Sequence, residues 1–466
     1  MTALHELGAR ELAAQYGSGA LSPVEVVRAV IERIARWEPR LHALWAYAPE
    51  AALALARASE ARWRARQPLS ALDGVPLTLK DNIATRGLAV PLGTAATELV
   101  PADEDAPPAA RLREAGAVLL AKTTMPDYGM LSSGLSSFHA LARNPWNLAT
   151  NPGGSSAGAG AAAAAGYGPL HLGTDIGGSI RLPAAWCGLV GLKPSLGRVP
   201  IKPPYIGRVA GPMTRSVEDA AALMAVVSGP DWRDATSLPP QAIDWNALDL
   251  DVRGLRLALL LDAGWGLACD PEIVAAVTRA ATLFEQAGAS VEPLAPFTTR
   301  EMADGIDLFW RVRSWTDISA LPRARQERVL PFVRQWAAGG ALASAAELFH
   351  GYGQFAALRD AAVAACQPFD FVLSPVAPLA SFAAEHAMPT NDPARAMEHI
   401  AYTLAYNMSA QPALSVPCAH HTSGAPIGLQ IAGRRHDDLG VLRMARAWER
   451  LRPAHALRPW PEPPAS

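Results

Sequence analysis

The segment at residues 151–198 reads NPGGSSAGAGAAAAAGYGPLHLGTDIGGSIRLPAAWCGLVGLKPSLGR and contains two glycine-serine turns. These turns make Ser155 and Ser179 candidate nucleophiles, because glycine has no Cβ and lets backbone N–H groups come close to a substrate oxygen. Between them, residues 156–165 are small and mostly alanine, a composition that favours a closely packed helix. We therefore expect the two turns to lie side by side, with the rest of the chain organised around them.

Size and charge limit the class of protein. The chain has 466 residues, enough for a large core, and its 41 basic and 43 acidic residues give a formal net charge of −2. This balance gives no electrostatic reason to bind nucleic acid or an acidic membrane surface. We therefore expect a small-molecule partner, with no nucleic-acid and no membrane partner.

The cysteines and residues 1–14 indicate the cellular compartment of the protein. The four cysteines are far apart and form no Cys-x-x-Cys pair, so neither a zinc site nor a disulfide framework is indicated. Residues 1–14 include Glu6, Arg10 and Glu11 and do not resemble a signal peptide, and no long uncharged apolar run predicts a membrane span. We expect a reduced, cytoplasmic protein that needs no cofactor and no metal.

Lysine is rare in this sequence. Only four of the 41 basic residues are lysines, namely Lys80, Lys122, Lys193 and Lys202. Where arginine is used almost everywhere else, a remaining lysine is a candidate for a task that requires loss of a proton, which arginine cannot perform. Drift in base composition explains any one lysine equally well, so the count alone selects none of them.

Local patterns predict helices that alternate with strands. Ser22 followed by proline and, at the third position, glutamate is a strong helix start, and a second helix is expected at 49–66. Residues 73–82 predict a turn, a short buried strand and a polar exit, with Lys80 at the strand's end, where sites in open α/β sheets tend to lie. Further strands are expected at 118–120, 255–261, near 291, and at 371–374, 413–416 and 427–431, and further helices after Ser216 and at 271–287, 394–406 and 438–451.

Strands recur along the whole chain, so we expect one large α/β domain rather than two. It covers residues 1–456, with a motif-bearing core at about 72–433, and the proline-rich tail at 457–466 is expected to be disordered. Residues 229–246 are the best linker candidate. Residues 297–354 are helical and rich in aromatic side chains, which form either a core under a helical cap or a hydrophobic wall for a substrate.

Two familiar motifs match formally but lack their structural context. Residues 154–158 fit Gly-x-Ser-x-Gly, the nucleophile elbow of α/β-hydrolases, with Ser156 as the nucleophile. That elbow needs a strand immediately before it, whereas residues 144–147 and 151–152 contain strand breakers. A dinucleotide-binding loop at 158–166 fails for the same reason and because its glycine spacing is wrong.

A third interpretation combines serine with lysine. A neutral lysine amine accepts a proton from one serine, which accepts a proton from a second serine, so a hydroxyl is activated without histidine. The histidines nearest the glycine turns are His139 and His171, and we interpret both as structural.

Several ordered motifs extend this interpretation over most of the chain. They are Gly74-Val75-Pro76 through Lys80-Asp81, Lys122-Thr123-Thr124-Met125-Pro126, Gly153-Gly154-Ser155-Ser156, Gly173-Thr174-Asp175-Ile176-Gly177-Gly178-Ser179-Ile180-Arg181, Gly191-Leu192-Lys193-Pro194, Gly211-Pro212-Met213 and Pro426-Ile427-Gly428-Leu429-Gln430. Together they resemble the amidase signature hydrolases, closest in pattern to stand-alone bacterial amidases. The resemblance implies a mixed β-sheet sandwiched between helices, and a Ser-Ser-Lys triad at Lys80, Ser155 and Ser179. One departure is Ala157, where the family usually has glycine and where a methyl group would narrow the pocket.

The resemblance also implies roles for the site residues. Neutral Lys80 would take a proton from Ser155, and Ser155 would take one from Ser179, whose Oγ attacks the amide carbonyl. Asp175 and Arg181 would pair and brace this loop, unless they form a plain surface ion pair. The residues implied for the oxyanion and the substrate, besides the Ser179 N–H, are Ile176, Gly177, Gly178, Gly129 and Met130.

The implied activity is hydrolysis of the C–N bond of small, rather apolar linear amides, with anilides or carbamates as related substrates. One alternative is the glutamine-hydrolysing A subunit of an aminoacyl-tRNA amidotransferase, against which the aromatic residues at 309–336 argue weakly. The other is a noncatalytic binding or assembly member of the family, against which the complete triad argues. The sequence does not determine the oligomeric state, for which a homodimer is one option.

Overall fold

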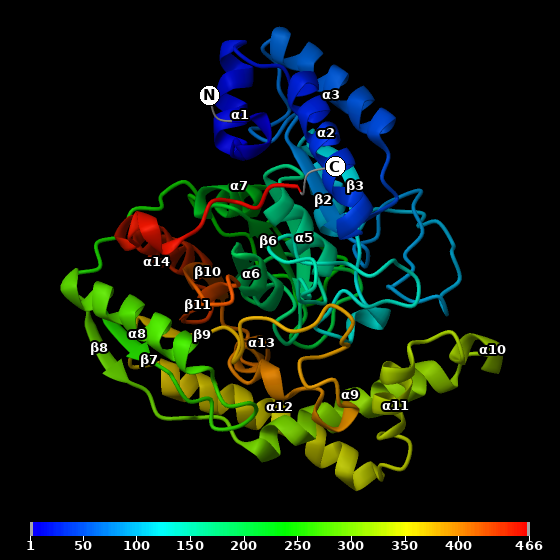
Figure 1. Cartoon of the computed structure of the whole chain (residues 1–466), viewed down its shortest axis with the longest axis vertical. Helices are drawn as coiled ribbons and strands as arrows, with labels where there is room; N and C mark the ends of the chain where they lie inside the picture. Colours follow the sequence, from blue (N-terminus) through cyan, green and yellow to red (C-terminus); the bar gives the residue numbers. More distant parts are fainter. Residues whose placement is uncertain (1–2, 464–466) are drawn as a thin grey trace.

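An eleven-stranded sheet runs through the whole molecule (Figure 1). In this computed structural model, which describes residues 3–463, the strands are β1 (Leu44–Trp45), β2 (Pro76–Lys80), β3 (Val118–Thr123), β4 (Leu170–Asp175), β5 (Val190–Lys193), β6 (Val209–Thr214), β7 (Arg256–Leu259), β8 (Ser290–Pro293), β9 (Phe371–Pro375), β10 (Ala413–His420) and β11 (Pro426–Gly433). They lie side by side in the order β1-β3-β2-β4-β6-β5-β10-β11-β9-β7-β8. β2 is parallel to β3 and β4, and β7 is parallel to β8 and β9, whereas the pairs between β4 and β9 are antiparallel. The sheet is therefore mixed, as expected.

Helices cover both faces of this sheet, so the chain forms a single α/β domain. The helices are α1 (Ala9–Ser18), α2 (Pro23–Leu41), α3 (Pro49–Arg64), α4 (Pro107–Glu114), α5 (Ala157–Ala165), α6 (Arg181–Cys187), α7 (Val217–Val227), α8 (Pro271–Gln286), α9 (Arg300–Ser319), α10 (Arg323–Gln326), α11 (Pro331–Ala338), α12 (Ala345–Cys366), α13 (Leu404–Met408) and α14 (Asp438–Leu451). Leu172, Leu192 and Leu414 point from the central strands into the main core with α7 and α14. Helices α5 and α6 pack on the opposite face.

Two helix starts read from the sequence are confirmed. The Ser22 side chain accepts a hydrogen bond from Val24 N at the start of α2, and Ser22 N donates to Glu25 Oε2 at 2.8 Å, which completes a capping box. The Ser216 side chain likewise accepts from Asp219 N at the start of α7. These starts depend on residues three positions apart, which explains why the sequence alone predicts them.

Glycines let α5 and α6 approach the sheet closely. A Cβ at Gly173 would lie 2.8 Å from Ser156 Oγ, and a Cβ at Gly191 would lie 2.5 Å from the Cβ of Ala184 in α6. These distances are shorter than side-chain atoms tolerate, so hydrogen alone fits at both positions. The alanine-rich helix and the glycine-bearing strands together bring the two serine turns near the same strand ends.

The central strands β4, β5 and β6 are absent from the predicted elements. Every residue of these three strands is buried, because helices or loops cover both faces of the sheet there. A strand buried on both faces shows no alternation of polar and apolar residues, which is the pattern that identifies a strand in a sequence.

The helix expected at 394–406 is wrong in detail. The structure has two 3-10 turns, Pro393–Arg395 and Glu398–Ile400, and then the short helix α13. At the interruption, Thr403 N donates to the carbonyl of Ile400, three residues earlier, at 2.9 Å, while the Thr403 hydroxyl donates to the carbonyl of Gly177 at 2.6 Å. A backbone bond to the residue three positions earlier is that of a 3-10 turn, whereas an α-helix bonds four positions earlier.

The linker candidate at 229–246 does not separate two domains, since Asp234 and Trp245 within it are buried. Residues 457–463 of the tail lie against the body of the molecule, which differs from the expected disorder; residues 464–466 lie outside the described residues. The reason is a pair of arginine contacts. Arg33 Nη1 donates to Glu462 Oε2 at 2.5 Å, and the Arg215 guanidinium stacks 4.4 Å from the Trp460 ring.

None of the helices in residues 3–463 combines the length and the apolar character needed to span a bilayer.

Candidate active site

A cavity of about 280 Å³ opens beside the carboxyl ends of β2 and β4. Of the site residues expected from the sequence, six line it: Gly129, Met130, Ser155, Ile176, Gly177 and Ser179. The other expected residues lie behind the cavity wall, namely Lys80, Asp175, Gly178 and Arg181. The two serine turns therefore meet at one surface, as the sequence predicts.

Lys80 is the last residue of β2 and is fully buried. Its Nζ lies 2.7 Å from Ser155 Oγ, 3.0 Å from Ser156 Oγ and 3.5 Å from the carbonyl oxygen of Thr174. Burial lowers the pKa of Lys80 to about 7, although the negative charges of Asp175 and, more weakly, Asp81 act in the opposite direction. A large fraction of the amine is therefore neutral near pH 7 and able to accept a proton.

Ser155 and Ser179 come from different elements and share the cavity wall. Ser155 lies at the start of the alanine-rich segment that forms α5, and Ser179 lies in the loop between β4 and α6. The two turns are joined by a hydrogen bond of 3.2 Å from Ser156 N to the carbonyl oxygen of Ser179. Gly129 leaves space for the Ser155 hydroxyl, since a Cβ there would lie 3.3 Å from Ser155 Oγ.

Ser156, the nucleophile of the α/β-hydrolase alternative, is in a different position. Its side chain is buried behind the wall, where the hydroxyl donates to the carbonyl of Thr174 at 3.1 Å and accepts from Thr174 N at 3.3 Å. Residues 151–155 form no strand, so the elbow's required context is absent there. Ala157, the departure from the family pattern, is buried in α5 and does not line the cavity.

The loop after β4 carries the N–H groups expected to bind an oxyanion. The N–H groups of Ile176, Gly177 and Ser179 have no acceptor among residues 3–463. The N–H of Gly178 differs, because it donates to Asp175 Oδ1 at 2.8 Å. Its hydrogen is thus used within the loop, so Gly178 shapes this loop and is not available to a substrate oxygen in this structure.

Asp175 and Arg181 form a buried ion pair that ties this loop together. Both side chains are fully buried, and Arg181 Nη2 lies 3.0 Å from Asp175 Oδ1, so this is not the surface pair of the alternative interpretation. Burial by itself would raise the pKa of Asp175, but the Arg181 charge and hydrogen bonds from Arg181, Ile180 N and Asn407 hold that pKa far below its usual range.

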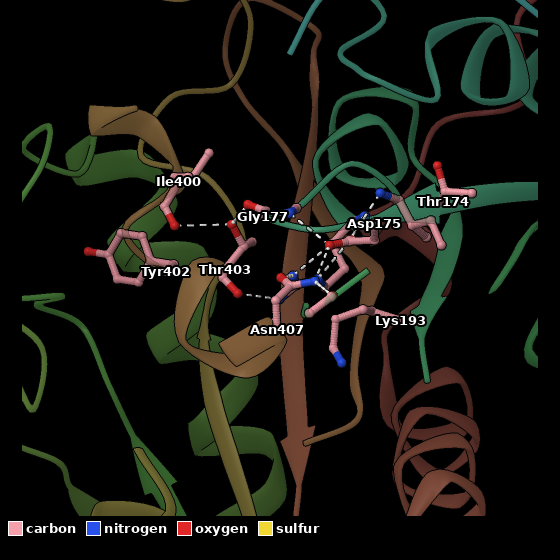
Figure 2. Close-up of polar contacts among 12 residues, drawn as sticks. Thr174, Asp175, Gly177, Lys193, Ile400, Tyr402, Thr403 and Asn407 are labelled. Carbon is pink, nitrogen blue, oxygen red and sulfur yellow. Dashed lines mark hydrogen bonds and ion pairs between the residues drawn. The ribbon is translucent and has the colours of Figure 1, made fainter. Parts of the chain in front are cut away.

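The same guanidinium binds the segment before β10 and the strand β11. Arg181 donates to the carbonyl oxygen of Thr403 and to Gln430 Oε1, both at 2.9 Å, and to Asn407 Oδ1 at 2.5 Å. Thr403 Oγ1 in turn donates to the carbonyl oxygen of Gly177 at 2.6 Å (Figure 2). All donors of Arg181 are satisfied, so the loop is fixed to chain more than 220 positions away.

The helical segment at 297–354 supplies part of the core, whereas its Phe349 and Tyr352 side chains are exposed. Trp336 and Phe355 pack in the second hydrophobic cluster, as the core interpretation predicts, and Trp310 alone of the aromatic side chains between 309 and 336 lines the cavity. Two arginines that the sequence did not single out, Arg208 and Arg313, also line it. In a chain so rich in arginine, no sequence signal distinguishes these two from the others.

The predicted structural roles of two histidines agree with their contacts. His139 Nε2 lies 2.8 Å from Asp81 Oδ2, and the ring of His171 contacts Thr78 Oγ1 and the carbonyl oxygen of Gly168. Neither ring lines the cavity.

Comparisons with known proteins identify the family of this chain. The family model described as Amidase matches residues 25–442. The A subunit of glutamyl-tRNA(Gln) amidotransferase from Myxococcus xanthus is 38% identical over 96% of this chain and 97% of its own length. Among solved structures, a bacterial aryl acylamidase of the amidase signature family superimposes with a TM-score of 0.90 at 30% identity, covering 98% of this chain and 100% of that one. The A subunit of glutamyl-tRNA(Gln) amidotransferase from Thermotoga maritima superimposes with a TM-score of 0.79 at 26% identity, covering 99% of both chains. The chain thus belongs to the amidase signature family.

Proposed function

We propose that this protein hydrolyses the C–N bond of an amide through an acyl-enzyme on Ser179. The observation that carries the proposal is the 2.7 Å contact between Lys80 Nζ and Ser155 Oγ at the wall of a cavity that Ser179 also lines. A buried lysine with a pKa of about 7 supplies the base that two serines need. A noncatalytic family member would have no need for this arrangement.

The proposed reaction begins with two proton transfers. Lys80 takes the hydroxyl proton of Ser155, Ser155 takes that of Ser179, and Ser179 Oγ bonds to the amide carbonyl carbon. When the C–N bond breaks, Ser155 returns a proton to the leaving nitrogen, and the amine departs. Water then attacks the ester, loses a proton to the same relay and releases the acid with Ser179 restored.

The oxyanion would be held by the N–H groups of Ile176, Gly177 and Ser179. These three groups have no acceptor within residues 3–463, and removing one preorganised donor from the oxyanion hole of a serine hydrolase costs about 3–4 kcal/mol. The bracing of the loop by Arg181 supports this role, because a fixed loop needs no rearrangement when charge develops.

For the substrate, the curated relatives favour glutamine over the small, apolar amides expected from the sequence. Several of these relatives carry the name of the A subunit of glutamyl-tRNA(Gln) amidotransferase, so glutamine hydrolysis together with partner chains is the second candidate function. The cavity contains Trp310 and other apolar groups but also Arg208 and Arg313, which an apolar amide would leave without a partner.

A substrate panel on the purified chain tests the proposal. We expect turnover of at least one among glutamine, primary amides, p-nitroanilides and aryl carbamates, and its loss in Ser179→Ala. A fluorophosphonate should add one adduct by intact mass, mapped to Ser179. Labelling of Ser156, or turnover that survives Ser179→Ala, would contradict the proposal.

A further inference from the structure

Two cations face the cavity, and the charge of one of them, Arg208, is poorly compensated within the protein. Arg208 lies just before β6, and Arg313 lies on α9, so the two approach the cavity from different elements. Tyr205 lies between these elements, with its ring centroid 4.7 Å from the Arg313 guanidinium. The hydrogen bond from Arg208 N to the carbonyl of Tyr205, 3.0 Å long, closes the turn that places Arg208 there.

Arg208 forms no ion pair with any residue between 3 and 463. Its Nη2 donates to the carbonyl of Pro203, while its Nε is buried and has no hydrogen-bond acceptor among these residues. Burial lowers the pKa of Arg208 to about 10, and the charge of Arg313 acts in the same direction. The side chain is therefore charged at neutral pH but poorly solvated, a state that an added anion would relieve.

Arg313 is better compensated than Arg208, because burial alone would lower its pKa but its neighbours Tyr205 and Asp317 outweigh burial and raise that pKa. Its Nε lies 3.3 Å from Asp317 Oδ2, one turn further along α9, but that carboxylate is more than half exposed to solvent. An exposed pair of this kind is worth little, typically ~0–1 kcal/mol. Asp234 is the acidic residue whose charge opposes the lowering of the pKa of Arg208 by burial. Its carboxylate already accepts hydrogen bonds from Ile201 N, Thr236 N and Thr236 Oγ1.

The rest of the cavity wall carries no opposite charge. Among its described lining residues there is no aspartate or glutamate, and much of the remaining surface is apolar, with Trp310, Met388 and Ile400 as examples. A carboxylate would find two guanidinium groups here, whereas an ammonium group would meet two positive charges and no carboxylate to pair with.

We propose that Arg208 and Arg313 form an anion subsite that selects amides bearing a carboxylate and rejects those bearing an α-ammonium group beside it. This inference rests on the proposed function, since it names the substrate class of the same cavity. It therefore argues against glutamine, the second candidate substrate, whose α-ammonium group lies beside its carboxylate. It favours the desamino analogue glutaramate, which has the same amide and carboxylate but no ammonium group.

Binding to Ser179→Ala separates recognition from turnover. Calorimetry would compare glutaramate with pentanamide, which has a methyl group in place of the carboxylate, and 4-acetamidobenzoate with 4-methylacetanilide, which places the carboxylate on the amine side. We expect the acid to bind at least about tenfold tighter than its neutral partner in one of the two pairs. The pair that shows the preference identifies which side of the amide faces the arginines.

Arginine variants test the assignment to these residues. In the Ser179→Ala background, Arg208→Gln and Arg313→Gln should each reduce the preference, and the double variant should abolish it. Arg323→Gln is the matched control, because Arg323 also pairs with an acid four positions later on a helix but is almost fully exposed and lies outside the cavity. Arg323→Gln should leave the preference unchanged.

The outcomes separate this inference from the proposed function. Equal binding within both pairs, or a preference that survives in the double variant, would overturn the anion subsite and leave Ser179 chemistry intact. Glutamine binding more tightly than glutaramate would overturn the rejection of ammonium groups. Turnover by Ser179→Ala would instead contradict the proposed function, whatever the arginine variants show.

Discussion

Lys80 and Lys122 lie on the neighbouring strands β2 and β3, where Leu79 and Lys122 are register partners. Both side chains are buried, and burial lowers the pKa of each to about 7. They differ in their neighbours. Lys80 lies beside two serine hydroxyls, whereas Lys122 Nζ binds the carbonyl of Ile83 and lies 3.1 Å from Thr85 Oγ1.

A lowered pKa therefore does not by itself identify a base. Lys193 makes the same point, since burial lowers its pKa to about 7 and its Nζ donates to the carbonyl of Pro194. Burial supplies a neutral amine in all three places. Among the three, Lys80 alone lies beside a serine hydroxyl on the wall of the cavity that Ser179 also lines, whereas the Thr85 hydroxyl near Lys122 lines a separate cavity without a second serine.

Lys80→Arg should be the most damaging change, because it keeps charge and bulk but cannot lose its proton. We expect it to reduce kcat/KM by about 10²–10⁴-fold, the usual contribution of a general base, and as severely as Lys80→Ala. Steady-state kinetics on the best substrate of the panel measures this. If Lys80→Arg retained more than about a tenth of wild-type kcat/KM, a barrier change under ~1.4 kcal/mol, the amine would be a positioning group and the relay wrong.

The pH dependence of the wild-type kcat/KM should reflect loss of the proton from the Lys80 amine. Because the base must be neutral, kcat/KM should fall about tenfold per pH unit below pH 7 and level off above about pH 8. The apparent pKa belongs to Lys80 and the two serines as a coupled unit. A profile that stays flat from pH 5.5 to 8 would mean that no group of this kind limits the rate.

Lys122→Met should alter the pH dependence of stability and leave catalysis alone. Between pH 7.5 and 9.5, Lys122 is neutral in the folded state and charged in the unfolded state, so unfolding takes up one proton and stability rises with pH. The variant should lose about 1.4 kcal/mol per pH unit of that slope in urea unfolding. Its kcat/KM should match the wild type, and a loss like that of Lys80→Ala would remove the distinction between the two lysines.

Lys202→Arg should change the protein least. Lys202 is half-exposed and pairs with Glu104 on the surface, and such substitutions usually change stability by less than about 0.5 kcal/mol. Both kcat/KM and the urea midpoint should remain at wild-type values. Lys122→Arg is a poorer control, because a guanidinium is larger than the buried site that holds the amine.

Short-range sequence patterns and the order of the motifs along the chain predicted much of the fold and of the site. The Ser22 cap depends on residues three positions apart, and the sequence motifs already grouped Lys80 with Ser155 and Ser179. What escaped prediction depends on long-range contacts, such as that between Arg181 and Asn407, 226 positions apart. Uncompensated charge at Arg208 is likewise a property of the folded surroundings, because the residue type is common in this chain.

The ion pair of Asp175 with Arg181 determines when the N–H groups of the loop after β4 become oriented. Water around an amide in solution must reorient as negative charge forms on the carbonyl oxygen, and that reorganisation is part of the barrier. Here the loop that carries the N–H groups of Ile176 and Gly177 is held by Arg181 before any substrate arrives. In the proposed mechanism these dipoles are oriented once, when the chain folds, and each turnover then begins from an environment already arranged for the charge it will create.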